Sequence, residues 1–316
     1  MPTILITSTS FGKKYRPPLE TLLSKGYELK FNDLGRPLAP EELVERLAGC
    51  DGCIAGLDHF TAEVIKRSPG LRIIARYGAG VDRVDMAVAA AAGVVVTNTP
   101  TANSDSVADL TVALMLAVAR KIPTAHRTVC EGRWENMYGV SLAEKTVGLI
   151  GFGRIGRRVA RRVQGFGCRV LACDPLLDPP SAAEAGVEIV ELDELLASAD
   201  FISLHLPASQ QNEGFLGAEQ FKQMKSSAIL VNTARGELID QQALIEALRS
   251  GRIRGAGLDA HTEEPPDVSL FDGLNNVVLT PHMGAYTEDA LINMAEGSVE
   301  NLCAFFEGRE PPNVMT

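Results

Sequence analysis

Three charged side chains follow short apolar stretches in the second half of the chain and could act together on a carboxylic acid. Arg235, either Glu263 or Glu264, and His282 each come a few residues after a stretch that is typical of a buried strand. A guanidinium binds a carboxylate through two parallel hydrogen bonds, and a Glu that is hydrogen-bonded to a His stabilises the imidazolium. If the three strands are neighbours, these groups meet at one edge of a sheet. An ion-pair network that only holds the loops together is the open alternative at this point.

The position of His282 distinguishes it from the other four histidines. It comes soon after the last apolar stretch, and the carboxyl ends of parallel strands face the ligand crevice of an open α/β sheet. His205 ends another such stretch, so we expect it to line the same crevice. His59, His126 and His261 have no motif around them, and we expect them to be structural or surface residues.

A glycine-rich turn between a strand and a helix predicts a dinucleotide site. Gly151, Gly153 and Gly156 form a G-x-G-x-x-G pattern after the stretch Val147–Ile150, and Asp174 ends the next strand. The first glycine makes the tight turn, the second lets the backbone approach the pyrophosphate, and the third lets helix and strand pack closely. The helix N-terminus offers free amides to the phosphates. Because a carboxylate binds both ribose hydroxyls and repels a 2′-phosphate, Asp174 favours NAD over NADP.

Short apolar stretches alternate with segments of helical spacing along nearly the whole chain. This alternation predicts parallel strands with crossover helices, hence an α/β fold, and the pattern restarts at Thr146. The strands are apolar throughout, as expected when both faces of a sheet are covered. The predicted strands are Thr3–Thr7, Cys53–Ala55, Ile73–Arg76, Val94–Thr97, Val147–Ile150, Arg169–Cys173, Phe201–His205, Ala228–Val231, Gly255–Leu258 and Val277–Leu279.

The longest helical stretch, Ser104–Arg120, lies between the two halves of this pattern. Asn103 or Ser104 can cap its start, because a side-chain oxygen there accepts from first-turn amides. Its apolar residues surround too much of the helix for a single buried stripe. We therefore expect a core helix, with a subunit interface as the alternative.

Composition limits the class of protein. The chain has 316 residues, which at roughly 150 per domain indicates two domains, and 46% of its residues are apolar. Its formal charge of −10 argues against broad nucleic-acid binding. No apolar run is long enough to cross a membrane, the start does not resemble a secretory signal, and six cysteines fit a reducing cytoplasm. Cys50 and Cys53 form a lone C-x-x-C without a second ligand pair, so we expect no metal.

The motifs together resemble the D-isomer-specific 2-hydroxyacid dehydrogenase family, and the nearest branch is that of the phosphoglycerate dehydrogenases. The resemblance runs from about Ile73 to Glu296, and the first 70 residues match only loosely. The motifs that carry it are ARYGAGVDRVD (Ala75–Asp85), NTPTANSDSVAD (Asn98–Asp109), GLIGFGRIG (Gly148–Gly156), VNTARGELID (Val231–Asp240), LDAHTEEPP (Leu258–Pro266) and LTPHMGA (Leu279–Ala285).

The resemblance implies roles for individual residues in an NAD-dependent oxidoreductase that interconverts D-2-hydroxy acids and 2-keto acids. Arg235 would bind the substrate carboxylate, and His282 would donate the proton in reduction and accept it in oxidation. Glu264 would be its partner rather than Glu263, because the family's acid directly precedes the proline. The implied substrate-binding backbone belongs to Tyr77, Gly78, Ala79 and Gly80. The implied cofactor-binding residues are Gly151, Gly153, Arg154, Ile155, Gly156, Asp174, His205, Leu206, Pro207, Thr233, Ala234, Asp259, Gly284 and Ala285, with Asp259 at the nicotinamide carboxamide.

The resemblance also implies how the chain is organised. A discontinuous, flavodoxin-like substrate domain would contain residues 1–99 and 289–316, and a Rossmann NAD-binding domain would contain residues 100–288. The reactants would lie between two domains that close and exclude water. A homodimer built on the NAD-binding domain would explain the apolar helix after Asn103.

Several departures from the family pattern leave the substrate open. His261 stands where an aromatic residue usually packs, and Leu206 stands where a threonine is common. The phosphoglycerate enzymes carry an arginine after the third strand, whereas Ile54–Leu57 contains none. The chain ends at Thr316, too early for the regulatory domain of long phosphoglycerate dehydrogenases. Pyruvate, hydroxypyruvate, glyoxylate and 3-phosphohydroxypyruvate all present the carboxylate and carbonyl that the site needs.

Two other functions stay open from the sequence. An NAD(H)-sensing interaction protein similar to the corepressors of this fold would keep the same three charged residues without turnover. Formate or phosphite oxidation is an alternative within the same class, although the additional site residues of those relatives are not visible here.

Overall fold

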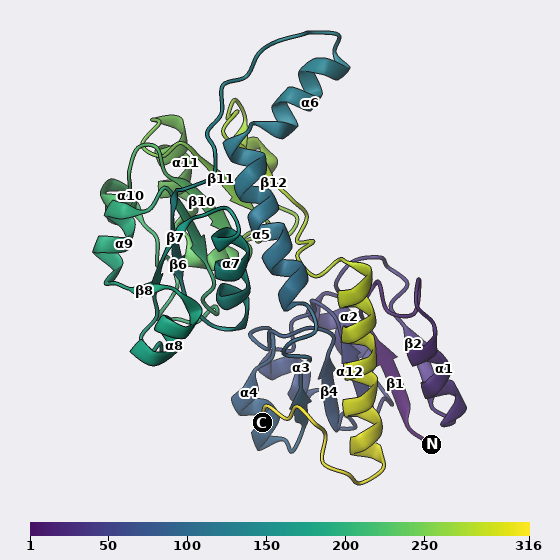
Figure 1. The fold of residues 1–316 in the computed structure, drawn as a ribbon. Coiled ribbons are helices and arrows are strands. Elements are labelled where there is room, and N and C mark those ends of the chain that lie inside the picture. Colours follow the sequence, from purple (N-terminus) through teal and green to yellow (C-terminus); the bar gives the residue numbers. More distant parts are fainter. The chain divides into compact units, whose positions relative to one another are not determined.

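Parallel sheets organise both halves of the chain in the computed structural model, which describes all 316 residues (Figure 1). The chain forms two units: residues 1–103 with 285–316 make unit 1, and residues 104–284 make unit 2. The boundaries proposed from the sequence, after residue 99 and after residue 288, lie close to these. The predicted α/β fold with two parallel sheets is confirmed.

Unit 1 contains a five-stranded sheet in the order β2-β1-β3-β4-β5, which is the flavodoxin-like arrangement. Helix α12 packs against β3, β4 and α1, so the C-terminal helix completes the N-terminal core. The strands are β1 (Thr3–Ile6), β2 (Glu28–Phe31), β3 (Gly52–Ala55), β4 (Ile73–Arg76) and β5 (Val95–Thr97). The helices are α1 (Pro17–Ser24), α2 (Pro40–Leu47), α3 (Ala62–Lys66), α4 (Met86–Ala91) and α12 (Glu288–Phe306).

Unit 2 contains a seven-stranded parallel sheet in the order β12-β11-β10-β9-β6-β7-β8. Counted from β6, this is the Rossmann order with one added strand, and the order reverses between β6 and β9, where ligands bind in such sheets. The strands are β6 (Thr146–Ile150), β7 (Arg169–Cys173), β8 (Glu188–Ile189), β9 (Phe201–Leu204), β10 (Ile229–Asn232), β11 (Gly255–Leu258) and β12 (Val277–Leu279). The helices are α5 (Ser104–Ala119), α6 (Ile122–Cys130), α7 (Arg154–Gln164), α8 (Pro179–Ala185), α9 (Leu192–Ser198), α10 (Ala218–Gln223) and α11 (Gln241–Arg249), with short 3-10 turns at Gly236–Leu238 and Val268–Phe271.

All ten strands expected from apolar stretches are present, and two further strands were not expected. β2 has the sequence ELKF and lies at the edge of its sheet, with no fully buried residue. β8 has two exposed residues at the edge of the other sheet. Edge strands need no continuous apolar sequence, so an apolar criterion does not find them.

Helix α5 is a core helix of unit 2, in agreement with the first of the two interpretations of its sequence. It packs against α7 and against β10, β11 and β12 (Figure 1). Glycines in β11 make room for it: a Cβ at Gly257 would lie 3.0 Å from Leu114 Cβ, and one at Gly255 would lie 2.8 Å from Val118 Cγ1. None of the helices combines the length and the apolar character that a membrane crossing requires.

Candidate active site

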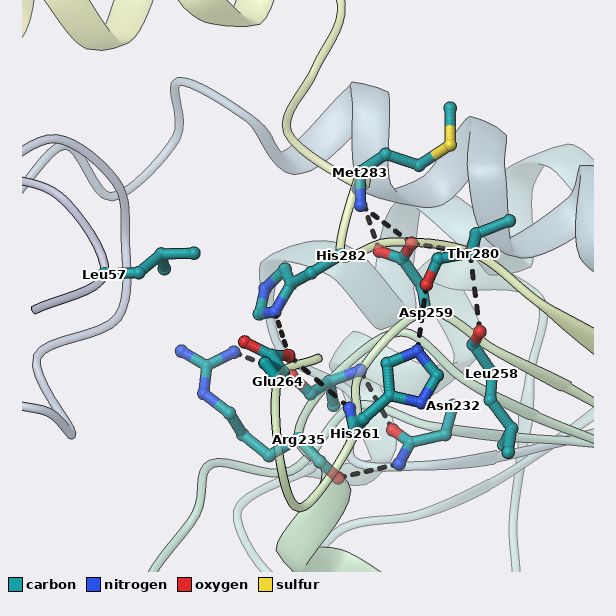
Figure 2. A network of polar contacts seen from close by, with 12 residues as sticks. Leu57, Asn232, Arg235, Leu258, Asp259, His261, Glu264, Thr280, His282 and Met283 are labelled. Atoms are coloured by element: carbon teal, nitrogen blue, oxygen red, sulfur yellow. Dashed lines mark hydrogen bonds and ion pairs between the residues drawn. The ribbon is translucent and has the colours of Figure 1, made fainter. Parts of the chain in front are cut away.

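Three neighbouring strands of unit 2 carry the predicted catalytic residues. β10, β11 and β12 are adjacent and parallel, so their carboxyl ends lie at one edge of the sheet. Arg235, Glu264 and His282 follow these three strands in that order. Figure 2 shows the three side chains together, with the Arg235 guanidinium and the His282 ring both directed toward the Glu264 carboxylate.

The imidazole of His282 is hydrogen-bonded to Glu264. The distance from Nδ1 to Oε1 is 2.5 Å, and the side chains of His282 and Glu264 are 24% and 20% exposed. Because an ionised carboxylate only accepts hydrogen bonds, Nδ1 carries the proton and Nε2 is the atom that can exchange a proton with a ligand. A negative carboxylate at this distance stabilises the imidazolium.

The backbone of His282 adopts a left-handed conformation, with a φ of 51°. For a residue with a Cβ this costs about 1–2 kcal/mol and is kept only where the surroundings fix it. The His282 amide donates to the Thr280 carbonyl over 3.0 Å, which closes a tight turn. This turn aims the imidazole at Glu264.

The side chain of Asp259 holds the same turn through hydrogen bonds. Its side chain is almost completely buried. One carboxylate oxygen accepts from the Met283 amide over 2.8 Å and from the Thr280 hydroxyl over 2.6 Å, and the other accepts from the Gly284 amide over 2.8 Å. Both oxygens are therefore engaged by the His282 turn, so Asp259 fixes the position of the imidazole. The predicted contact of Asp259 with the nicotinamide carboxamide stays a prediction.

The turn that carries Arg235 is held by Asn232, a residue that the sequence does not mark as functional. Its Nδ2 donates to the Arg235 carbonyl over 2.7 Å, and its Oδ1 accepts from the Ala234 amide over 3.0 Å. Gly236 must be a glycine, because a Cβ there would lie 2.1 Å from the backbone of His261. The NTARG motif therefore shapes a turn that packs tightly against the loop carrying Glu264.

The glycine-rich turn after β6 has the geometry that a dinucleotide needs. Gly151 has a φ of 92°, and a Cβ there would lie 2.7 Å from the carbonyl oxygen of His205. A Cβ at Gly156 would lie 2.5 Å from the Gly151 carbonyl oxygen, which explains the close packing of helix and strand. Around Gly153 nothing lies within 4 Å of a Cβ, so a pyrophosphate can approach the backbone at the start of α7. The residues present fit NAD.

Asp174 at the end of β7 lies next to this turn. One of its oxygens accepts from the Phe152 amide over 2.6 Å, and the other accepts from the Leu176 amide over 2.8 Å. The Asp174 carboxylate thus lies beside the glycine-rich turn, at the position from which it could bind the adenosine ribose of NAD. Arg154 and Ile155 form the first turn of α7, with Arg154 exposed.

The other predicted cofactor residues of unit 2 lie at neighbouring strand ends. His205 follows β9, and its Nε2 is buried without a hydrogen-bond partner. Burial lowers the pKa of His205 to about 4, so the ring is neutral near pH 7. Leu206 and Pro207 come next in the chain, and Thr233 forms a buried hydroxyl pair with Thr111 of α5 at 2.8 Å.

The predicted substrate loop, Tyr77–Gly80, follows β4 in unit 1, and two residues not found from the sequence shape it. Buried Arg76 donates through Nε to the Gly80 carbonyl over 2.9 Å and through Nη1 to the Ala55 carbonyl over 2.7 Å. Asn98 donates to the Ala79 carbonyl over 2.7 Å. Ala285, predicted at the cofactor, is the first residue of the C-terminal part of unit 1.

The remaining sequence candidates lie elsewhere. Cys50 and Cys53 are buried free thiols of unit 1, and burial raises the pKa of both. His126 lies on α6 within 3.7 Å of the Cys130 sulfur. His261, expected to be structural or at the surface, lies in the loop that carries Glu264, where its Nε2 is 2.9 Å from the Thr280 carbonyl oxygen.

Comparison with known proteins identifies the family. Residues 112–284 match the profile of the NAD binding domain of D-isomer specific 2-hydroxyacid dehydrogenases. A glyoxylate reductase of Korarchaeum cryptofilum is 42% identical over 288 residues, which cover 88% of this chain and 86% of that relative. This chain belongs to the D-isomer specific 2-hydroxyacid dehydrogenase family. The resemblance stated from the motifs is confirmed.

Two other similar proteins extend the comparison. A D-3-phosphoglycerate dehydrogenase of Methanocaldococcus jannaschii is 44% identical over 284 residues, which cover 88% of this chain and 54% of that relative. This chain therefore spans about half the length of that enzyme. The crystal structure of protein TT0316 from Thermus thermophilus has a TM-score of 0.90 and 40% identity, covering 99% of this chain and all of that one.

Family membership establishes the class of enzyme. The chain is an NAD-dependent oxidoreductase of the D-2-hydroxyacid dehydrogenase class, and the family's NAD-binding domain falls within unit 2. This domain includes the glycine-rich turn at Gly151–Gly156 and the strand ends that carry Arg235, Glu264 and His282.

Proposed function

We propose that this dehydrogenase reduces a short 2-keto acid without a phosphate group, with glyoxylate and hydroxypyruvate as the first candidates. The His282–Glu264 hydrogen bond carries the acid–base part of the proposal, because it leaves Nε2 of His282 for the substrate oxygen. Leu57 supports the substrate class, since it follows β3 where the resemblance associates an arginine with phosphate binding. A glyoxylate reductase is also among the relatives that match along most of both chains.

In the proposed reaction the side chains of unit 2 bind the acid and move one proton. Arg235 holds the substrate carboxylate with its planar guanidinium, which orients the 2-keto carbon. NADH, when bound, would supply the hydride that this carbon needs. His282 donates a proton from Nε2 to the keto oxygen. Glu264 stabilises the imidazolium before the transfer. In the reverse direction neutral His282 accepts the hydroxyl proton.

The predicted cofactor contacts are part of the same proposal. The amides around Arg154 and Ile155 bind the pyrophosphate, Asp174 binds the adenosine ribose, and the buried unpaired Nε2 of His205 indicates a polar partner in the bound cofactor. Leu206, Pro207, Thr233, Ala234, Asp259, Gly284 and Ala285 complete the proposed cofactor contacts. The amides of Tyr77–Gly80 are proposed to bind the substrate carboxylate.

A homodimer built on unit 2 is the proposed assembly. Two aromatic side chains in the segment after α6 are almost fully accessible, Trp134 at 90% and Tyr138 at 87%, and Ile122 and Val129 on α6 are about half exposed. Exposed apolar side chains on one helix and on the segment that follows it support a protein interface there. The cytoplasmic location stays a prediction from the cysteine content.

One screen tests the proposed function and its alternatives. NADH oxidation is followed with glyoxylate, hydroxypyruvate, pyruvate and 3-phosphohydroxypyruvate, with calorimetry of NADH binding alongside. We expect turnover to be fastest with glyoxylate or hydroxypyruvate. Preference for the phosphorylated acid would contradict the substrate class, and tight NADH binding without turnover of any acid would favour the NAD(H)-sensing alternative.

A further inference from the structure

A second imidazole lies beside the acid–base pair. His261 follows β11, three residues before Glu264, and is partly buried. Its ring Nε2 is 2.9 Å from the carbonyl oxygen of Thr280, and its own amide lies 3.5 Å from Oε1 of Glu264. This is the oxygen that bonds to His282. The ring of His261 therefore contacts the loop that carries His282, and the backbone amide of His261 contacts the Glu264 carboxylate (Figure 2).

The Thr280 carbonyl is the point where these contacts converge. It accepts the His282 amide over 3.0 Å, which closes the turn that puts His282 at a φ of 51°, and it accepts the ring of His261 on its second lone pair. The Thr280 hydroxyl is bonded to Asp259. Residue 280 is thus fixed by Asp259 on its side chain and by His261 on its backbone, and a left-handed residue persists only where neighbouring contacts fix it in this way.

The chemistry of the contact defines what His261 can do. A carbonyl oxygen only accepts hydrogen bonds, so Nε2 of His261 carries the proton. Both the neutral Nε2–H tautomer and the imidazolium provide this donor, so protonation of the ring does not break the contact. A phenylalanine at this position would have no such donor. This contact suits His261 to holding the loop in place.

We propose that His261 is a positioning residue. It fixes the Thr280–His282 turn and so keeps the His282 imidazole hydrogen-bonded to Glu264. The inference rests on the proposed function, because it assigns a residue to the acid–base pair of that reaction. It predicts that the hydrogen-bond donor of residue 261 matters for turnover, whereas its contribution to substrate and cofactor binding is small.

Two substitutions separate the donor from the shape of the ring. His261→Gln places an amide N–H at a similar distance along the side chain, and His261→Phe keeps a flat ring without a donor. With the best acid of the screen, we expect His261→Phe to lower kcat about tenfold with KM and NADH affinity within about twofold of wild type. His261→Gln should restore most of kcat. His126→Gln, at an exposed histidine of α6, is the matched control.

A spectroscopic readout keeps the test independent of turnover. The proton of the short Nδ1–H hydrogen bond of His282 should give a resonance at high chemical shift in the NMR spectrum of the wild-type protein. The loss of this resonance in His282→Gln identifies it. We expect it to persist in His261→Gln and to broaden or move upfield in His261→Phe. If the phenylalanine variant does not fold, as judged by its melting temperature, His261→Met replaces it.

The outcomes distinguish this inference from the proposed function. Absence of turnover by the wild-type enzyme with all four acids would contradict the proposed function, and the imidazole proton would then decide the role of His261. Wild-type kcat and an unchanged proton signal in His261→Phe would overturn the inference. Equal loss in the glutamine and phenylalanine variants would overturn it as well, because the donor would then not be the feature that matters.

Discussion

Oε1 of Glu264 lies 2.5 Å from Nδ1 of His282, and the two residues follow adjacent strands of one parallel sheet. The contact fixes the orientation of the ring, and in the proposed reaction it leaves Nε2 to exchange the proton. The proposed acid–base pair is therefore already formed by unit 2 through its own loops. An enzyme that has its hydrogen bonds in place before the reaction avoids rearranging them during it.

Replacing the charge of Glu264 should lower the rate of reduction. Glu264→Gln retains a hydrogen-bond acceptor but removes the negative charge that stabilises the imidazolium. Since reduction needs the protonated ring, we expect kcat/KM at pH 7.5 to fall about 10- to 100-fold. Glu263→Gln, at the exposed neighbouring carboxylate, should behave as wild type. An unchanged kcat/KM in Glu264→Gln would remove Glu264 from the pair.

Arg235 should act mainly in binding the acid. Arg235→Lys keeps the charge but loses the planar fork that matches a carboxylate, so we expect KM for the keto acid to rise about 10- to 100-fold. The dissociation constant for NADH, measured by fluorescence, should stay near that of wild type. Arg249→Lys, at an exposed arginine of α11, is the control. A wild-type KM in Arg235→Lys would contradict the assignment.

The preference for NAD over NADP should depend on the charge of Asp174. Asp174→Asn can still accept from the Phe152 amide, which Asp174 does over 2.6 Å, but it no longer repels a 2′-phosphate. We expect the ratio of kcat/KM for NADH to that for NADPH to fall about tenfold or more. If the ratio does not change, the carboxylate does not select the cofactor.

His205 should make the protein sensitive to acid. Its pKa is lowered to about 4 in the folded chain, so the unfolded chain binds more protons between pH 4 and the ordinary histidine range near 6.5. The free energy of unfolding therefore falls as pH drops through this window, by about 2 kcal/mol from His205 between pH 7.5 and pH 5. Urea denaturation without cofactor should show this loss reduced in His205→Asn and unchanged in His126→Gln. An equal loss in His205→Asn and wild type would contradict the burial argument.

The sequence predicted the strands that position the site better than it predicted the contacts within the site. Continuous apolar stretches identified β10, β11 and β12, because a strand covered on both faces has no polar alternation. The edge strands β2 and β8 lack this property and were missed. The order of the unit 2 sheet then follows from the Rossmann topology, which places three strand ends side by side.

Contacts that depend on exact loop geometry could not be derived from residue spacing. Nothing in the sequence indicates that both oxygens of Asp259 accept hydrogen bonds from the turn of His282, or that Asn232 holds the turn of Arg235. In the sequence, His261 is a histidine without a surrounding motif and a departure from an aromatic pattern. Its contact with Thr280 joins two loops that follow different strands, and only the folded chain brings these loops together.

The central claim is that Nε2 of His282 exchanges the proton with the substrate oxygen. The most direct test compares kcat for NADH-dependent reduction of glyoxylate or hydroxypyruvate between wild type and His282→Gln, with NADH binding measured on the same samples. We predict a loss in kcat of about 10²- to 10⁴-fold with unchanged NADH affinity. A kcat within twofold of wild type in a folded, NADH-binding His282→Gln enzyme would contradict the account.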